Sequence, residues 1–306
     1  MKRECKMYDI IIIGSGAAGL TAAIYAKRAS LNAIIIEKEF MGTGQIAFAE
    51  RVENYPGLFG LSGFDLGDKF REHAEQLGAE FFEGEVNSLK KDGENWTVSV
   101  ADGTRLESKT VIFAAGASHR RLDVPGGDKQ KISYCAVCDG SLYKDKTVAV
   151  IGGGDTALGD ALYLSKIAKT VYLIHRRNEF RANKSLQGRV FNTDNIVPIM
   201  EAKLSVVTGG ESADGIDFVQ NGEPKHLDLD GIFAAIGNIP NSNILNGICD
   251  LDESGFVIAG EDCRTTADGL FAAGDVRTTP LRQVITAAAD GARAVIAAEN
   301  YISERR

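Results

Sequence analysis

The sequence predicts an α/β fold with two parallel sheets. Two observations predict it: a pattern of strand, glycine-rich turn and helix occurs twice, and each copy is followed by another β-branched run. Continuous β-branched runs are typical of parallel strands that are buried on both faces. The length of 306 residues also favours two domains with separate cores.

The first copy of the pattern lies near the N-terminus. We expect a buried strand over Tyr8–Ile13, a turn over Gly14–Gly19 and a helix over the Ala- and Leu-rich stretch 20–26. The apolar run Ala33–Ile36 then completes a β-α-β unit, whose two strands are parallel and joined by a right-handed crossover.

The second copy has the same order in the middle of the chain. Thr147–Ile151 is expected to form the strand, Gly152–Ala157 the turn and 158–164 the helix. Thr170–Ile174 supplies the second strand of this unit. The internal repeat therefore predicts two sheets of the same construction.

Turn residues mark where the chain passes between the two units. Ala117–Ser133 is polar, has little periodicity and contains Pro125-Gly126-Gly127, so we expect the first boundary there. Ile239-Pro240-Asn241 indicates a return crossing within Asn238–Asn243.

The composition excludes several classes of protein. A net charge of -8 argues against nucleic acid as the main partner, because phosphate binding needs basic surface. No uninterrupted apolar run approaches the roughly 18 residues of a membrane span. The short run Ile10–Ile13 enters a glycine turn and does not resemble the core of a signal peptide. Three of the five cysteines, Cys5, Cys249 and Cys263, are isolated in sequence. This spacing does not predict a secreted disulfide framework, so we expect a cytoplasmic protein with one special cysteine pair.

The first glycine turn has the features of a Rossmann dinucleotide site. Gly14 permits the tight turn, Gly16 allows the backbone to approach a pyrophosphate, and Gly19 allows close packing of the helix. The helix N-terminus favours phosphate charge, and Glu37 at the end of the next strand can accept hydrogen bonds from a ribose. A glycine turn without a ligand is the structural alternative.

The second glycine turn differs at the end of its second strand. Arg176, Arg177 and Arg181 occur where the first copy has an acidic residue. Guanidinium groups suit the 2'-phosphate of NADPH, whereas a solvated basic turn is the alternative. The turn residues expected to bind this nucleotide are Gly152, Gly154, Asp155 and Thr156.

If one site holds NADPH, the other is expected to hold the acceptor of its hydride. A flavin accepts two electrons from nicotinamide and can pass them to thiols, so we expect FAD at the first site.

A cysteine pair lies between the two glycine turns. Cys135 and Cys138 have the CxxC spacing, which permits a small disulfide ring and commonly lowers a thiol pKa. Asp139 beside them could move a proton to or from a thiolate, or it could simply begin a turn. Half of a zinc site and two inert cysteines are the other interpretations, but the remaining cysteines and histidines do not match zinc spacing, so no metal is expected.

Taken in order, these motifs resemble those of the bacterial, low-molecular-weight thioredoxin reductase family. The resemblance covers nearly the whole chain. It rests on Gly14–Gly19, Glu53–Gly57, Cys135–Gly140, Gly152–Ala157, His175–Arg181, Gly269–Asp275 and Arg282–Ala288.

The resemblance implies further flavin-binding residues near the C-terminus and in the first domain. Gly274 and Asp275 would lie at the ribityl and pyrophosphate part of FAD. Gln45, Asn54 and Gln283 would lie near the isoalloxazine ring or the phosphates.

The resemblance also implies how the chain is organised. An NADPH-binding domain over 118–243 would be inserted in an FAD-binding domain made of 1–117 and 244–306. The family is homodimeric, and its inserted domain reorients so that the flavin faces either nicotinamide or the cysteine pair. Cys138 would then be the sulfur that faces the flavin, and Cys135 the one that meets the partner.

The chain departs from the family pattern at a few positions. Ala17 replaces a frequent proline, and Thr43-Gly44-Gln45 replaces a double glycine before glutamine. Asp128–Ile132 is shorter and differently composed than in relatives, where this region lies near the protein substrate, so the resemblance specifies the chemistry more closely than the partner. Larger glutathione-reductase-like enzymes are disfavoured, because no cysteine occurs between Cys5 and Cys135.

The expected activity is the transfer of electrons from NADPH through FAD and the Cys135/Cys138 pair to a small redox protein, most simply thioredoxin. Two alternatives remain at this point. One is a reductase of another CxxC carrier, such as a glutaredoxin-like or peroxidase-linked protein. The other is a flavoprotein whose cysteines sense redox state without rapid turnover.

Overall fold

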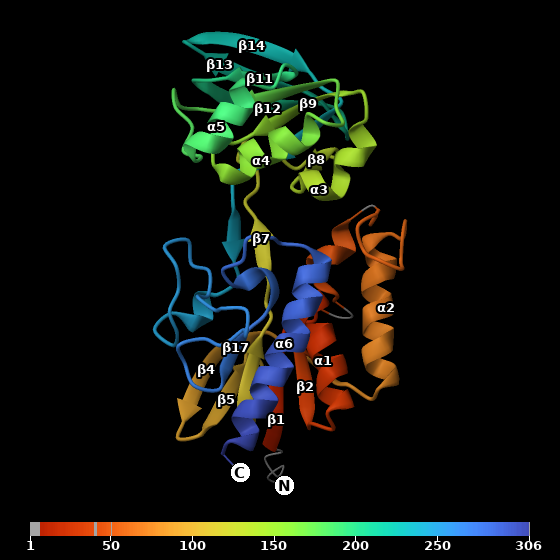
Figure 1. The fold of residues 1–306 in the computed structure, drawn as a ribbon, viewed down its shortest axis with the longest axis vertical. Helices are drawn as coiled ribbons and strands as arrows, with labels where there is room; N and C mark the ends of the chain where they lie inside the picture. The colour runs from red at the N-terminus through yellow and green to blue at the C-terminus, as the bar shows by residue number, and fades with distance from the viewer. Residues whose placement is uncertain (1–6, 40–41, 50, 306) are drawn as a thin grey trace. The chain divides into compact units, whose positions relative to one another are not determined.

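The computed structural model describes residues 7–39, 42–49 and 51–305 (Figure 1). The chain divides into two units, one containing the described residues up to Ser118 and from Ile239 onward, the other His119–Asn238. The chain therefore leaves its first unit and later returns to it. The two connecting segments, β7 (Ala117–His119) and β16 (Asn238–Pro240), pair with each other as a two-stranded sheet.

The first unit contains a seven-stranded sheet with the order β3-β2-β1-β6-β5-β4 and β17 beside β6. Its strands β3, β2, β1, β6 and β17 are parallel neighbours, whereas β4 and β5 add an antiparallel hairpin. Strand β6 pairs with β5 through its first half and with β17 through its second. The bounds are β1 Met7–Ile13, β2 Ala33–Glu37, β3 Glu80–Glu83, β4 Val86–Asp92, β5 Asn95–Val100, β6 Arg105–Phe113 and β17 Leu270–Ala272.

Both faces of this sheet are buried, which explains the unbroken isoleucine run of β1. Ile10 and Ile12 pack with residues of α1 (Ala17–Arg28) and α6 (Val284–Ser303), while Ile11 and Ile13 pack against the opposite layer around Trp96. Figure 1 shows α1 and α6 side by side, and they are in extensive contact. The remaining helical elements are α2 Gly63–Gln76, η1 Gly44–Phe48, η3 Asn243–Leu245 and η4 Gly274–Val276.

The second unit contains a five-stranded parallel sheet with the order β11-β10-β9-β15-β8. Val148 and Val150 of β9 face the helices, whereas Ala149 and Ile151 face an antiparallel three-stranded sheet. The bounds are β8 Ile132–Ser133, α3 Ala136–Asp139, η2 Gly140–Tyr143, β9 Thr147–Ile151, α4 Asp155–Leu164, β10 Thr170–Ile174, α5 Lys184–Phe191, β11 Ile196–Ile199, β12 Ala202–Gly209, β13 Ala213–Gln220, β14 Glu223–Asp228 and β15 Gly231–Ala234.

The predicted α/β class is confirmed. Both β-α-β units form where the repeat placed them, and in each the two strands are parallel neighbours. The β4–β5 hairpin and the β12-β13-β14 sheet were not predicted. β4, β12 and β14 alternate exposed and buried residues too irregularly to mark a sheet face, whereas β5 alternates regularly and could have been recognised as a strand.

Candidate functional site

The first glycine turn joins the end of β1 to the start of α1. A Cβ atom on Gly14 would lie 2.5 Å from the carbonyl oxygen of Ala114, and one on Gly19 would lie 1.8 Å from that of Gly14. Packing within the protein therefore requires these two glycines. A Cβ on Gly16 would meet nothing closer than 3.9 Å. The chain itself does not need a glycine at position 16, and the open space suits a group that approaches the backbone.

The N-terminus of α1 is suited to phosphate. Among the described residues no side chain caps its first amides, and its first turn has no acidic residue. Unsatisfied amides and the positive end of the helix dipole favour an anion at this position. The turn and the helix thus fit the pyrophosphate of a dinucleotide.

Glu37 lies at the end of β2 and faces this turn. Its Oε2 accepts a hydrogen bond from the backbone N–H of Ser15, and the Ser15 hydroxyl lies 2.8 Å from the same oxygen. Its Oε1 accepts from the backbone N–H of Glu39 at 3.1 Å. An ionised carboxylate accepts about four hydrogen bonds, so Glu37 keeps capacity for a ribose hydroxyl.

The two segments expected to share a flavin lie in one unit. The Asn54 side-chain amide donates to Oε1 of Gln283 at 2.9 Å, although 229 residues separate them. Gln283 also caps α6 through a reciprocal hydrogen-bonded pair with Thr286. Gln45 lies exposed in η1, and within the described residues its side chain has no hydrogen bond. The structure therefore joins Asn54 and Gln283 by a hydrogen bond and shows no such link from Gln45 within the described residues.

Asp275 lies in η4, directly after β17. Burial raises the pKa of its carboxyl to about 6, the Arg282 charge lowers it, and the Asp290 charge raises it. This carboxyl group is costly to ionise inside the protein, and hydrogen-bond donors beside it would offset that cost. The hydroxyls of a ribityl chain would provide such donors.

The second glycine turn repeats the steric pattern of the first. A Cβ on Gly152 would lie 2.4 Å from the carbonyl oxygen of Ala235, whereas one on Gly154 would meet nothing within 4 Å. No side chain caps α4 at Gly154 among the described residues. Within the two glycine turns, Gly16 and Gly154 are thus the positions where glycine leaves room for a ligand.

Asp155 and Thr156 follow this turn at the start of α4. The Asp155 carboxylate accepts from the backbone N–H of Asn183 at 2.8 Å and from its side-chain amide at 3.1 Å. Asp155 therefore fixes the loop that follows the arginines. Thr156 is exposed and has no side-chain hydrogen bond within the described part of the chain.

Three arginines surround the second turn. Arg176, Arg177 and Arg181 are exposed, and in the described residues none of their guanidinium groups forms an ion pair or a hydrogen bond. The backbone N–H of Arg181 donates to the carbonyl of Gly153 at 2.8 Å, which holds this loop at the glycine turn. Three unpaired guanidinium groups beside an open glycine turn fit a nucleotide with an additional phosphate.

His175 is buried beneath the same turn. A Cβ atom on Gly153 would lie only 2.2 Å from the His175 ring, so the ring fills the space beside this glycine. The Nε2 atom of His175 lies 3.1 Å from the Glu179 carbonyl oxygen. Burial lowers the pKa of His175, and the charges of the three arginines lower it further. A neutral His175 is thus a packing residue that supports the turn.

The cysteine pair lies at the start of α3. Cys135 and Cys138 form a disulfide with a Cα–Cα distance of 5.3 Å. Ala136 is buried in the core with α4, whereas Val137 and Leu142 are about 40% exposed. The core therefore fixes one side of the short helix and leaves a partly exposed disulfide with apolar neighbours.

A buried serine links this disulfide to Asp139. The Ser133 hydroxyl donates to Oδ2 of Asp139 at 2.6 Å and accepts from the backbone N–H of Cys135 at 3.1 Å. Sequence reasoning did not identify Ser133. A small polar residue two positions before a CxxC pair was the only available signal, and it did not reveal the turn that brings Ser133 back to Asp139.

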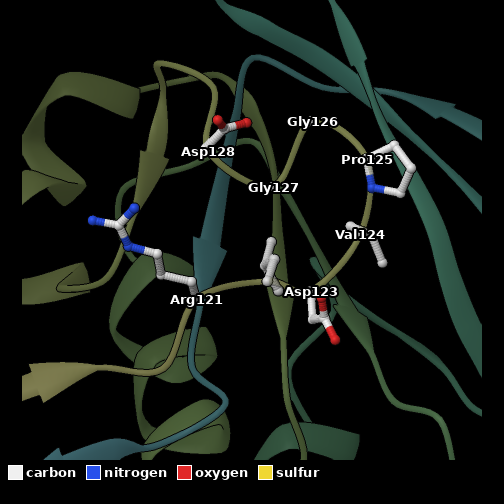
Figure 2. Close-up of a pocket in the computed structure, with 8 residues that line it drawn as sticks. Arg121, Asp123, Val124, Pro125, Gly126, Gly127 and Asp128 are labelled. Atoms are coloured by element: carbon white, nitrogen blue, oxygen red, sulfur yellow. The ribbon is translucent and has the colours of Figure 1, made fainter.

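A hollow of about 420 Å³ lies in the loop before the cysteines, between Arg121 and Asp128 (Figure 2). Burial raises the pKa of Tyr134, Arg121 lowers it, and Asp128 raises it. The charges of Arg121 and Asp128 thus act on Tyr134, the residue that precedes Cys135. Figure 2 shows the side chains of Arg121, Asp123 and Asp128 around the loop.

The other described cysteines are unlike the pair. Burial raises the pKa of Cys249 to about 11 and that of Cys263 to about 12, so both stay protonated thiols at neutral pH. Cys5 lies outside the described residues. In the described part of the chain, no three His, Cys, Asp or Glu side chains form a group that could hold a metal ion. Likewise, none of the described helices is long and apolar enough to span a membrane.

Comparison with known proteins gives consistent similarities. Residues 8–291 match the pyridine nucleotide-disulphide oxidoreductase family. The thioredoxin reductase of Listeria monocytogenes is 37% identical, covering 99% of this chain and 97% of that protein. The bifunctional thioredoxin reductase/thioredoxin of Mycobacterium leprae is 40% identical, over 97% of this chain and 66% of that protein. The crystal structure of the Streptococcus pyogenes thioredoxin reductase is 37% identical with a TM-score of 0.91, covering 98% of this chain and all of that one.

Proposed function

Because the chain belongs to the pyridine nucleotide-disulphide oxidoreductase family, we propose that it is an NADPH-dependent flavoprotein disulfide reductase of the thioredoxin reductase type. One observation carries the proposal: a disulfide between Cys135 and Cys138 occurs in the same chain as two glycine turns that leave room for a dinucleotide. Relatives that match nearly the full length of the chain support it.

The first unit is proposed to bind FAD, through residues 1–117 and 244–306. Gly14, Gly16 and Gly19 shape the turn for the pyrophosphate, and Glu37 accepts from the adenosine ribose. Bound FAD supplies the two-electron chemistry that connects a nicotinamide to a disulfide. Further contacts are assigned to Gln45, Asn54, Gly274, Asp275 and Gln283.

The second unit is proposed to bind NADPH, through residues 118–243. Gly152 permits the close packing of the turn and Gly154 leaves it open, while the amides at the start of α4, including those of Asp155 and Thr156, would hold the pyrophosphate. Arg176, Arg177 and Arg181 bind the 2'-phosphate. Within the described residues their guanidinium groups have no ion pair or hydrogen bond, which supports this role, because an adenine nucleotide with that phosphate would pair them.

The reduced cysteine pair is proposed to carry out thiol-disulfide exchange. The Cys135 thiolate attacks one sulfur of the partner's disulfide, a mixed disulfide forms, and the partner's other sulfur leaves as a thiolate. The Cys138 thiolate then attacks Cys135, which restores the Cys135–Cys138 disulfide and releases the partner as a dithiol. Two electrons pass to the partner, and its two leaving thiolates take up one proton from Asp139 and one from solvent.

Thioredoxin is the proposed partner. Supporting this choice, one relative is described as combining thioredoxin reductase and thioredoxin in a single protein. The exposed Val137 and Leu142 provide apolar surface beside the disulfide. The protein is further proposed to act as a homodimer in the cytoplasm, where reducing conditions keep such a pair in turnover.

A carrier panel tests the proposed function. Purified protein would be assayed for NADPH oxidation with thioredoxin, a glutaredoxin-like protein, a peroxidase-linked CxxC protein or no carrier. We expect rapid oxidation with thioredoxin and little without a carrier. NADPH oxidation only with one of the other carriers would identify that carrier as the partner in place of thioredoxin. Slow NADPH oxidation with every carrier would favour a redox sensor.

A further inference from the structure

A buried ion pair lies beneath the turn that bears Asp275. The side chains of Arg277 and Asp290 are each 4% exposed. Nε of Arg277 donates to Oδ2 of Asp290 at 2.7 Å, and a terminal nitrogen donates to Oδ1 at 2.8 Å. Burying two charges is costly, and a pair of apolar residues often stabilises a core as well or better. Such a pair therefore calls for a role besides stability.

The ion pair holds both ends of the η4 turn. Oδ2 of Asp290 accepts from the backbone N–H of Gly274 at 3.1 Å, where the turn begins. Arg277 ends the turn and donates through one nitrogen to the carbonyl oxygens of Ala259 and Thr278, at 3.2 and 3.0 Å. Asp275 lies between these two anchored ends. One carboxylate from α6 thus fixes the path of the backbone around Asp275.

The same carboxylate lies where α6 contacts the start of α1. A Cβ on Gly291, the residue after Asp290, would lie 2.1 Å from the carbonyl oxygen of Ala18. A Cβ on Gly274 would lie 3.0 Å from the Cβ of Ala18. The η4 turn, α6 and the first turn of α1 therefore meet at one place, immediately beside the open Gly16.

We propose that Arg277 and Asp290 are positioning residues for FAD, which hold the Gly274–Asp275 backbone at the pyrophosphate end of the α1 site. This inference rests on the proposed function, because it assumes that the first unit binds FAD. The pair does not touch the cofactor. It acts by fixing a glycine with φ +78 and the adjacent carboxyl group in the orientation that the ligand meets.

The test replaces the pair with apolar residues of similar size, Arg277→Met with Asp290→Leu. This variant keeps the core filled but leaves the N–H of Gly274 without its acceptor. A matched control is Lys109→Met with Asp9→Asn, which removes an ion pair between β1 and β6, away from the glycine turn. The FAD dissociation constant would be measured from flavin fluorescence, and folding of the apoprotein from circular dichroism and thermal unfolding.

We expect the Arg277/Asp290 variant to fold and to bind FAD about tenfold or more weakly, the scale of one lost hydrogen bond that orders a binding group. The control should bind FAD like the wild type. Wild-type FAD affinity in a folded Arg277/Asp290 variant would show that the pair serves stability alone.

A conservative variant covers the case in which the double variant does not fold. Arg277→Lys keeps the charge and leaves Asp290 to accept from Gly274, so its FAD affinity should fall less than that of Asp290→Asn. Equal FAD affinity for Arg277→Lys, Asp290→Asn and wild type would overturn the inference. Failure of wild-type protein to bind FAD would contradict the proposed function itself and the inference with it.

Discussion

Ser15 approaches Oε2 of Glu37 through both its backbone N–H and its hydroxyl, each at 2.8 Å. The glycine turn thereby fixes the acidic residue at the end of the next strand before any ligand binds. Ser15 is fully buried and Glu37 is partly buried, so the serine side of these contacts is shielded from solvent. The relationship makes Glu37 a preorganised acceptor for a ribose.

The first prediction concerns this carboxylate. Glu37→Gln should weaken FAD binding roughly tenfold or more, because hydrogen bonds to a charged group contribute about 1.5–3 kcal/mol and 1.4 kcal/mol is tenfold. The flavin retained after ultrafiltration measures the effect. Glu39→Gln, at a neighbouring exposed carboxylate, should retain FAD like the wild type. A yellow Glu37→Gln protein that binds FAD with wild-type affinity would refute the role of Glu37 as the ribose acceptor.

The second prediction concerns nucleotide choice. The wild type should use NADPH in preference to NADH by about two orders of magnitude or more, since each charge-assisted contact to the 2'-phosphate contributes about 1.5–3 kcal/mol. Arg176→Ala with Arg177→Ala should raise the KM for NADPH and leave that for NADH nearly unchanged. Arg189→Ala, an exposed arginine of α5, is the control. Equal wild-type kcat/KM for both nucleotides would show that these arginines form only a solvated turn.

The third prediction concerns Ser133, whose hydroxyl is hydrogen bonded to Asp139. Ser133→Ala should slow reduction of the carrier about tenfold and shift its pH profile, because Asp139 loses the hydrogen bond that orients it for proton transfer. Reduction of an artificial acceptor should not change. Ser133→Thr should restore much of the rate, and Ser141→Ala at an exposed neighbour should have no effect. An unchanged pH profile in Ser133→Ala would exclude the positioning role.

The fourth prediction concerns the pH dependence of stability. Burial raises the pKa of Asp160 from 3.8 to about 7, and in the described residues its carboxyl has no hydrogen bond or ion pair. Between about pH 4 and pH 7 the folded protein therefore binds more protons at Asp160 than the unfolded chain does. The stability that the neutral Asp160 carboxyl contributes is lost as the pH rises through that window, so the free energy of unfolding falls.

The variant Asp160→Asn keeps the neutral form at every pH. Its thermal midpoint should match that of the wild type near pH 4 and exceed it at pH 8. Asp194→Asn, at an exposed aspartate, should follow the wild type throughout. A constant difference between wild type and Asp160→Asn at all pH values would rule out the titration of Asp160 as its cause.

The repeated β-α-β pattern could be predicted from sequence because it follows from local rules. Ile10–Ile13 must be buried on both faces, and Gly14 must avoid Ala114. The links made by Ser15 and Ser133 could not be predicted, because a serine hydroxyl has partners that only the folded backbone brings near. The Arg277–Asp290 pair was also missed, since charged residues 13 positions apart give no sequence signal of burial.

The measurement that tests the central claim most directly separates the two half-reactions in Cys135→Ser and Cys138→Ser. Each variant should retain FAD and still transfer electrons from NADPH to an artificial acceptor, because that route needs neither sulfur. Each should lose nearly all reduction of thioredoxin, because one thiol must attack and the other must resolve the mixed disulfide. Cys249→Ser, at a partly buried thiol, is the control and should keep both activities. Wild-type thioredoxin reduction by either Cys135→Ser or Cys138→Ser would contradict the proposed route through this disulfide.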